Sequence, residues 1–242
     1  MKKIDLLRCN KYDVDAIPHV LCGGFTKEET EYVLVDCHYL GLDNIMALRG
    51  DAMKHEPYFK PTVGGNNFAS ELVKQIKELN DGKYLHNIIE TTNKSDFCVG
   101  VAGYPEKHLE APSMDSDLRR LKEKVVAGAD YVVTQMFFDN QAYFDFVAKC
   151  RKNGINIPII PGLKPLTTKR QLSSLPQNFH VNMPDELVRM VEDAKSKEAV
   201  KEAGIAWCIK QAKELKDAKV PVLHFYTMGK SNPTAEIARA VF

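Results

Sequence analysis

Six short apolar runs, rich in strand-forming residues, recur along the chain, and each is followed by a helical pattern. The runs cover residues 14–21, 44–48, 97–102, 131–136, 157–161 and 222–226. They are apolar on both faces rather than alternating with polar residues, which is typical of parallel strands that are covered on both sides. Strands that alternate with helices in this way predict an α/β fold with a parallel sheet.

Capping residues mark the ends of the predicted helices. Thr26 with Glu29 predicts a capping box at the start of one helix. Two further N-caps and three glycine stops complete the pattern: Ser113, Asn140, Gly41, Gly128 and Gly154. Two or three helices are also expected within residues 167–216, with Pro176 and Pro184 as breaks between them.

The number of strand–helix units favours a barrel. A closed (β/α)8 barrel needs eight units in typically about 250 residues. Here six units already fill 242 residues, so the count predicts a TIM-type (β/α)8 barrel lacking roughly the first two βα units. Because the last strand lies close to the C-terminus, we expect the absent units to precede residue 14. A single partial barrel domain over residues 1–242 is the simplest organisation, and a doubly wound open sheet is the structural alternative.

Composition argues against nucleic acid and membranes as partners. Lys and Arg together number 33 against 32 Asp and Glu, so no global field would hold the chain on a polyanion. No apolar stretch has the length of a signal peptide or a membrane span. The six cysteines are scattered without a CxxC pair, which is typical of reduced thiols. We therefore expect a soluble, cytoplasmic protein that acts on a small molecule.

Common nucleotide and metal motifs are absent from the sequence. It contains neither a GxGxxG turn nor a GxxxxGK[ST] loop, so a nucleotide would have to be held without a Rossmann turn or a P-loop. The histidines are too dispersed for a zinc site, and we predict no metal.

Polar residues follow each predicted strand. Active sites of parallel β/α folds lie at the carboxyl ends of the strands, which makes these residues candidates for chemistry: His19, Arg49, Gly50, Asp51, Tyr104, His108, Gln135, Lys164 and Lys230. Some also have structural explanations. His19 fits a core histidine, Arg49 beside Asp51 fits a local ion pair, and the charged run from Asp117 to Lys124 fits a solvated helix face. Gln135 points more strongly to a ligand, because its amide can both donate and accept.

Four motifs occur in order along the chain: Leu48-Arg49-Gly50-Asp51, Ala102-Gly103-Tyr104-Pro105-Glu106-Lys107-His108, Thr134-Gln135-Met136-Phe137-Phe138-Asp139 and His224-Phe225-Tyr226-Thr227. In order and spacing they resemble the methylenetetrahydrofolate reductase family. The resemblance runs from about Asp15 to Phe242 and favours the eight-unit barrel over the open sheet. It implies a noncovalent FAD in the barrel mouth and NAD(P)H as the reductant. The implied reaction reduces 5,10-methylenetetrahydrofolate to 5-methyltetrahydrofolate by ping-pong chemistry, with the flavin as the relay.

The resemblance also implies roles for individual residues. FAD contacts are expected at His19, Arg49, Gly50, Asp51, Tyr104, His108, Asp117 and Lys124. Of these, Arg49, His108 and Lys124 suit the phosphates or the ribityl chain. Asp51 is also the expected catalytic residue, because its charge would stabilise a cationic iminium on the folate. Folate contacts are expected at Gln135, Gln171 and Lys230, where Lys230 replaces an arginine of some relatives.

One expected catalytic group has no counterpart in the sequence. The family's general acid is a glutamate at the end of the first barrel strand, and that strand belongs to the units expected to be absent. A noncatalytic or weakly FAD-binding remnant is therefore the alternative function. Unpaired strand edges would favour pairing with another chain, so a homo-oligomer is a further alternative. The remaining alternative function is a lyase of aldolase type, in which Lys164 or Lys124 would form a Schiff base with the substrate.

Overall fold

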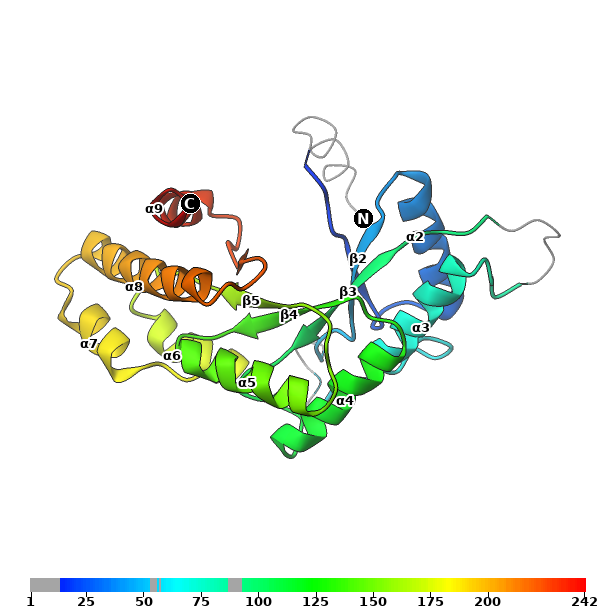
Figure 1. The fold of residues 1–242 in the computed structure, drawn as a ribbon, viewed down its shortest axis with the longest axis horizontal. Coiled ribbons are helices and arrows are strands. Elements are labelled where there is room, and N and C mark those ends of the chain that lie inside the picture. Colours follow the sequence, from blue (N-terminus) through cyan, green and yellow to red (C-terminus); the bar gives the residue numbers. More distant parts are fainter. Residues whose placement is uncertain (1–13, 53–55, 57, 87–92) are drawn as a thin grey trace. The chain divides into compact units, whose positions relative to one another are not determined.

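The computed structural model describes residues 14–52, 56, 58–86 and 93–242 (Figure 1). The chain divides into two compact units. Unit 1 consists of Met1–Ala102 and Arg120–Val132, and unit 2 consists of Gly103–Arg119 and Val133–Phe242. The expected single domain over residues 1–242 stays a prediction.

The strands lie within or close to the predicted apolar runs. They are β1 (His19–Leu21), β2 (Asn44–Leu48), β3 (Cys98–Gly103), β4 (Tyr131–Met136), β5 (Ile159–Leu163) and β6 (His224–Phe225). Among the described residues they form one sheet in the order β1-β2-β3-β4-β5-β6, and β1–β2, β2–β3 and β5–β6 pair in parallel. A strand order that follows the chain is that of a β/α barrel, whereas a doubly wound sheet reverses its direction partway. The α/β class is confirmed, and the number of absent units stays a prediction.

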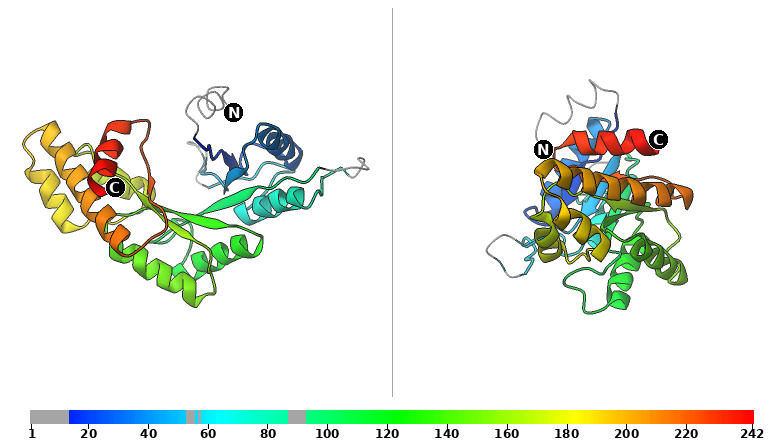
Figure 2. Two further views of the ribbon diagram at one scale, coloured as in Figure 1. Left: turned by 45° about the horizontal axis from the view of Figure 1, so that its top comes forward. Right: turned by 90° about the vertical axis from the view of Figure 1, so that its left-hand side faces the viewer.

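Helices connect the strands. They are α2 (Lys27–Tyr39), α3 (Ala69–Asn80), α4 (Met114–Val126), α5 (Asn140–Lys152), α6 (Gln171–Phe179), α7 (Asp185–Asp193), α8 (Lys197–Asp217) and α9 (Ser231–Val241). In unit 2, α8 packs against α7 and α9 (Figure 2). Of the helices in the described part of the chain, none has both the length and the apolar character needed to cross a bilayer.

Most predicted helix boundaries are confirmed. The Thr26 hydroxyl accepts a hydrogen bond from Glu29 N (3.2 Å), and the Glu29 carboxylate accepts one from Thr26 N (2.8 Å), which completes the capping box. Ser113 Oγ likewise accepts from Ser116 N (3.1 Å) at the start of α4. The three glycine stops all have positive φ: Gly41, Gly128 and Gly154. Local sequence therefore determines where these helices begin and end.

Two predicted boundaries are wrong. The N-cap of α5 is Asp139, whose side chain accepts from Gln141 N (2.9 Å), rather than Asn140. Asn140 is buried instead, and its side chain donates to the Glu214 carboxylate of α8 (2.8 Å). This contact between helices takes the place of a capping bond. Pro176 lies inside α6 rather than ending it. Pro176 cannot donate a backbone hydrogen bond, but its carbonyl still accepts the bond from His180 N (2.9 Å) that closes this helix.

Unit 2 has a core of side chains from β4, α6, α7, α8 and the loops between them. The cluster consists of Met136, Phe138, Leu166, Leu175, Val181, Leu187, Val191, Val200 and Trp207. The indole N–H of Trp207 donates to the Phe138 carbonyl (3.0 Å), which satisfies the one polar atom of this buried ring.

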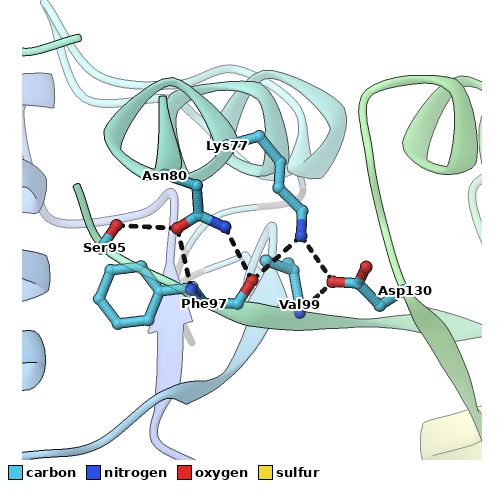
Figure 3. Close-up of polar contacts among 6 residues, drawn as sticks. All are labelled: Lys77, Asn80, Ser95, Phe97, Val99 and Asp130. Carbon is cyan, nitrogen blue, oxygen red and sulfur yellow. Dashed lines mark hydrogen bonds and ion pairs between the residues drawn. The ribbon is translucent and has the colours of Figure 1, made fainter. Parts of the chain in front are cut away.

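In unit 1 the start of β3 is held by side chains of α3 (Figure 3). Asn80 Oδ1 accepts from Phe97 N (2.9 Å) and Ser95 Oγ (2.8 Å), and Asn80 Nδ2 donates to Phe97 O (3.0 Å). The amide of Asn80 thus pairs with both backbone groups of Phe97, as a neighbouring strand would.

A lysine–aspartate pair extends this network (Figure 3). Lys77 Nζ donates to Phe97 O (3.0 Å) and to Asp130 Oδ2 (2.7 Å). The same carboxylate oxygen accepts from Val99 N (2.7 Å). The network therefore links α3, β3 and the residue before β4.

We expect Asn80→Ala to lower the free energy of unfolding by about 2 kcal/mol, because it leaves buried polar groups at Ser95 and Phe97 without a partner. Urea denaturation followed by circular dichroism measures this change. Asn178→Ala, on the exposed surface of α6, is the control and should leave the midpoint unchanged. Equal midpoints for the two variants would contradict the strand-like role of Asn80.

Candidate active site

Three of the predicted residues follow β2 directly in unit 1. Arg49 Nε donates to Gly50 O (3.3 Å), and the guanidinium carbon lies 4.8 Å from the centroid of the Phe59 ring. Gly50 has φ +89°, a left-handed conformation that favours glycine. Asp51 is exposed. This strand end therefore offers an aromatic-stacked cation and an exposed carboxylate. Phe59 was not predicted, because nothing in its local pattern indicates the stacking.

His19 lies in the neighbouring strand β1, where it pairs in register with Met46 of β2. The residue is exposed while Val20 beside it is buried. The explanation as a core histidine is therefore wrong. Desolvation of part of the ring lowers the pKa of His19 below its usual 6.5, which favours the neutral form at neutral pH.

Lys124 of α4 reaches the carboxyl end of β3. The side chain is half-buried, and Nζ donates to the carbonyl of Ala102. The prediction that Lys124 belongs to a solvated helix face is therefore wrong. The same prediction is confirmed for Arg120, which forms an exposed ion pair with Glu123 (2.9 Å). The ammonium of Lys124 thus lies at the strand end where β/α folds hold their ligands.

In unit 2, three predicted residues lie together after β3. Asp117 Oδ2 accepts from His108 N (2.9 Å), so Asp117 also departs from a purely solvated role. The rings of Tyr104 and His108 meet edge to face, with centroids 4.6 Å apart. His108 Nδ1 accepts from Glu110 N (3.1 Å), which assigns the proton of the neutral ring to Nε2. The imidazole is therefore oriented by its surroundings, as a ligand contact requires.

The loop that carries His108 is fixed by hydrogen bonds of two side chains, those of Lys107 and Glu106, that the sequence did not reveal. Lys107, with φ +79°, donates to the carbonyls of His108 (3.0 Å) and Ala111 (2.6 Å). Glu106 accepts from the backbone N (2.7 Å) and the side-chain amide of Asn182. Burial raises the pKa of Glu106, and the bonds from Asn182 oppose that rise. Asn182 is distant in sequence, so no local signal indicates this pair.

Gln135 lies in a small pocket of unit 2 that Tyr104, Glu106 and His180 also line. Its Oε1 accepts from Met136 N (2.9 Å). Among the described residues, Gln135 Nε2 donates to no acceptor. The amide N–H groups of this half-buried side chain therefore have no acceptor among the described residues, and the folate contact expected of Gln135 stays a prediction.

Gln171 has a structural role at the start of α6. Its Oε1 accepts from Thr167 N (2.7 Å) and Thr168 N (3.1 Å). Folate binding by this residue stays a prediction, and it would have to use the Nε2 group because the carbonyl oxygen is already bonded.

Lys164 follows β5 directly and is only 8% exposed. Among the described residues, its ammonium forms one hydrogen bond, from Nζ to the carbonyl oxygen of Tyr226 (3.4 Å). Burial, followed by the charge of Lys230, lowers the pKa of Lys164. Lys230 itself is exposed and precedes α9.

We expect Lys164→Met to raise the free energy of unfolding at pH 7 by about 1 kcal/mol, because it removes a poorly paired buried amine. The folded pKa lies below the unfolded value of 10.5, so the unfolded chain binds more protons between these two values. Stability of the unchanged protein therefore rises with pH across that window, and the advantage of the variant should shrink toward pH 10.5. Urea denaturation at pH 7, 9 and 10 tests this. Lys152→Met, at an exposed site on α5, should show no such trend.

The predicted site residues fall into both units. Unit 1 holds His19, Arg49, Gly50, Asp51 and Lys124, and unit 2 holds Tyr104, His108, Asp117, Gln135, Gln171 and Lys230. Within unit 2, Tyr104 and Gln135 line the same pocket. Gln171 bonds to Thr167, which lines a second cavity together with Lys230. One ligand shared by all of these residues stays a prediction.

The chain is similar to methylenetetrahydrofolate reductases along nearly all of its length. The family model of methylenetetrahydrofolate reductase matches residues 4–241. Methylenetetrahydrofolate reductase 1 of Schizosaccharomyces pombe is 34% identical over 225 residues, which cover 90% of this chain and 34% of the relative. The chain thus spans about a third of the length of this fungal relative.

A bacterial relative and a solved structure complete the comparison. The 5,10-methylenetetrahydrofolate reductase of Escherichia coli (strain K12) is 32% identical over 232 residues, covering 94% of this chain and 70% of the relative. The crystal structure of 2,3-dimethylmalate lyase, a PEP mutase/isocitrate lyase superfamily member, has a TM-score of 0.50 at 9% identity and covers 97% of this chain and 61% of that one. That likeness concerns the fold alone. On the family match and the identity to the bacterial enzyme, the chain belongs to the methylenetetrahydrofolate reductase family.

Proposed function

We propose that this chain takes part in the reduction of 5,10-methylenetetrahydrofolate to 5-methyltetrahydrofolate, with NAD(P)H as the electron source and FAD as the cofactor. The observation that carries the proposal is the location of the family motifs. Three of the motif segments follow the carboxyl ends of β2, β3 and β4: Arg49-Gly50-Asp51, Tyr104 to His108, and Asp139. Gln135 is the next-to-last residue of β4. This is the edge at which parallel β/α folds bind ligands.

The chemistry of the side chains at these strand ends supports FAD as the cofactor. Bound FAD would supply two-electron chemistry that lets the nicotinamide and the folate react in turn. The cations of Arg49 and Lys124 and the oriented imidazole of His108 suit phosphate or hydroxyl groups. Stacking on Phe59 holds the guanidinium of Arg49 in one orientation, and the left-handed Gly50 leaves backbone open to close approach.

We assign folate binding to residues whose polar atoms can still bond to a ligand. Gln135 Nε2 would donate to an acceptor on the pterin, since its Oε1 is already bonded to the backbone. The exposed carboxylate of Asp51 would stabilise positive charge that develops on the folate. Gln171 and Lys230 would contact the rest of the substrate. A cytoplasmic location and a homo-oligomer remain parts of the proposal.

We expect Lys124→Met to weaken FAD binding about tenfold, because one cationic contact to the cofactor is lost. Fluorescence titration of the purified protein with FAD measures the dissociation constant. Arg120→Met removes the same charge one turn earlier on α4, where the side chain pairs with Glu123 at the surface, and should leave FAD binding unchanged. Equal affinities for the two variants would remove Lys124 from the site.

The function itself is tested on the full chain supplied with FAD. We expect a flavin absorbance band that survives gel filtration, oxidation of NAD(P)H, and 5-methyltetrahydrofolate as a product identified by mass spectrometry. A protein that stays colourless with added FAD would overturn the proposal. Oxidation of NAD(P)H without folate turnover would favour the alternative of a flavin-binding protein without reductase activity.

A further inference from the structure

The ring of Phe59 lies between Arg49 and the turn that follows β1, and all of these residues belong to unit 1. The guanidinium carbon of Arg49 is 4.8 Å from the centroid of the ring, which is the geometry of a cation–π contact. The ring also packs on Gly23, where an added Cβ atom would lie only 3.1 Å from Cε2 of Phe59. Gly23 therefore supports the ring directly with its backbone.

Backbone hydrogen bonds hold Gly23 and Arg49 in one frame. Cys22 N donates to Leu48 O (3.0 Å), and Gly23 N donates to Arg49 O (3.2 Å). These two bonds continue the parallel pairing of β1 with β2 beyond the strand ends. The backbone positions of Gly23 and Arg49 are therefore fixed relative to each other, and the orientation of the long Arg49 side chain is what a further contact can still restrict.

The loop that carries Phe59 is tied to the start of α2. Thr62 Oγ1 accepts from Gly24 N (3.0 Å), and Gly64 O accepts from Lys27 N (3.0 Å). Both bonds come within a few residues of Phe59 along the chain. They hold the segment that follows Phe59 beside the turn after β1.

Two buried amides strengthen this attachment. Asn66 is 1% exposed, and its Nδ2 donates to Gln75 Oε1 (2.7 Å). Gln75 belongs to α3, and its Nε2 donates in turn to Lys27 O (2.7 Å). The loop, α3 and the residues at the start of α2 thus share one hydrogen-bonded network, so the position of the Phe59 ring is determined by the fold.

We propose that Phe59 is a positioning residue for the cofactor: its ring, supported by Gly23, holds the guanidinium of Arg49 in the orientation that binds FAD. The choice of FAD rests on the proposed function. The family resemblance assigns Arg49 to the cofactor, whereas Phe59 and Gly23 are assigned by their contacts. A cation already held in one orientation loses less conformational freedom when it binds an anionic group, so the ring strengthens binding by acting through Arg49.

A double-mutant cycle on FAD affinity tests whether Phe59 acts through Arg49. Phe59→Leu keeps an apolar side chain but removes the ring, and it should weaken FAD binding about fivefold in a fluorescence titration of the full chain. In an Arg49→Met background the same change should alter the affinity by less than about 1.5-fold, because no cation remains to be held. Phe59→Trp restores an aromatic face and should bind within about twofold of the unchanged protein.

Two results of this cycle would overturn the proposal. One is a pair of losses that simply add, since Phe59 would then act independently of Arg49. The other is a Phe59→Trp variant that binds as weakly as Phe59→Leu, since an aromatic face would then be irrelevant.

The neighbouring Tyr58 provides a matched control. Its ring is 71% exposed, so Tyr58→Leu removes an aromatic side chain from the same loop and should leave FAD affinity unchanged. Urea denaturation verifies that each variant is folded. A loss equal to that of Phe59→Leu would assign the effect to the loop as a whole and contradict a specific role of Phe59.

Gly23→Ala tests the support of the ring. The added methyl group pushes against the ring edge and should weaken FAD binding about threefold, again only while Arg49 is present. An affinity equal to that of the unchanged protein would overturn the role of Gly23.

A measurement without the cofactor reports the order of the Arg49 side chain directly. In protein labelled isotopically at its arginine nitrogens, the heteronuclear NOE of Arg49 Nε should fall in Phe59→Leu and recover in Phe59→Trp. The spectrum of Arg49→Met identifies the signal. If the unchanged protein binds no FAD, the proposed function and the cofactor role of Phe59 both fail. Normal FAD binding with an NOE that Phe59→Leu does not change would overturn the positioning role alone.

Discussion

We expect Gly204→Ala to lower the free energy of unfolding by about 3 kcal/mol, although the same change in an exposed helix stabilises proteins by about 1 kcal/mol. Gly204 lies within α8, and a Cβ atom there would come within 2.7 Å of the carbonyl carbon of Leu166 and closer still to its oxygen. Leu166 is 1% exposed, so its backbone has little room to retreat. The helix would have to move away from the segment that follows β5.

A companion variant on the same helix makes this prediction specific. Ala206 is exposed on α8, and Ala206→Gly should destabilise by about 1 kcal/mol through helix propensity alone. Urea denaturation of both variants measures the two free energies. If Gly204→Ala proves as stable as the unchanged protein, α8 does not approach Leu166 as closely as described.

The second large effect is expected in catalysis. Asp51→Asn should slow reduction of methylenetetrahydrofolate about 100-fold, because a neutral amide stabilises developing positive charge on the folate far less than a carboxylate does. Oxidation of NAD(P)H should change by less than about threefold, since that half of the reaction develops no cationic folate. Stopped-flow measurements separate the two halves: NAD(P)H is mixed with the oxidised FAD-loaded protein, and methylenetetrahydrofolate is mixed with the FAD-loaded protein after its flavin has been reduced.

The control for this variant uses the other end of the same strand. Asp43 immediately precedes β2 and is exposed, whereas Asp51 comes after the strand. Asp43→Asn removes the same charge at the amino end and should leave both rates within about twofold, because a distant exposed charge is screened. Equal slowing of both half-reactions in Asp51→Asn would indicate a role in binding or folding instead.

The strands and most helix ends could be predicted because their signals are local. A buried parallel strand requires consecutive apolar residues, and the runs at 44–48 and 131–136 coincide with β2 and β4. A helix start requires a side-chain acceptor within a few residues, which Thr26 supplies. The apolar run at 14–21 predicts a longer strand than β1, which occupies only His19–Leu21. Apolar content does not specify which backbone groups form hydrogen bonds to a neighbouring strand.

The site was less predictable because its contacts join distant parts of the chain. Asn182 bonds to Glu106 across 76 residues, and no local pattern reports that pair. Spacing alone also assigned Lys124 and Asp117 to a solvated face, although both bond to backbone at or after the end of β3. The resemblance to the reductase family assigned these two residues to the site, where physical reasoning from the sequence did not.

Helix α4 has a consequence for how this protein could be divided experimentally. The boundary between Arg119 and Arg120 falls inside the helix Met114–Val126, so one helix contributes its first turns to unit 2 and its last turns to unit 1. Each unit is therefore encoded by two separate stretches of the gene. A single cut at any position therefore leaves at least one of the two units divided between the fragments.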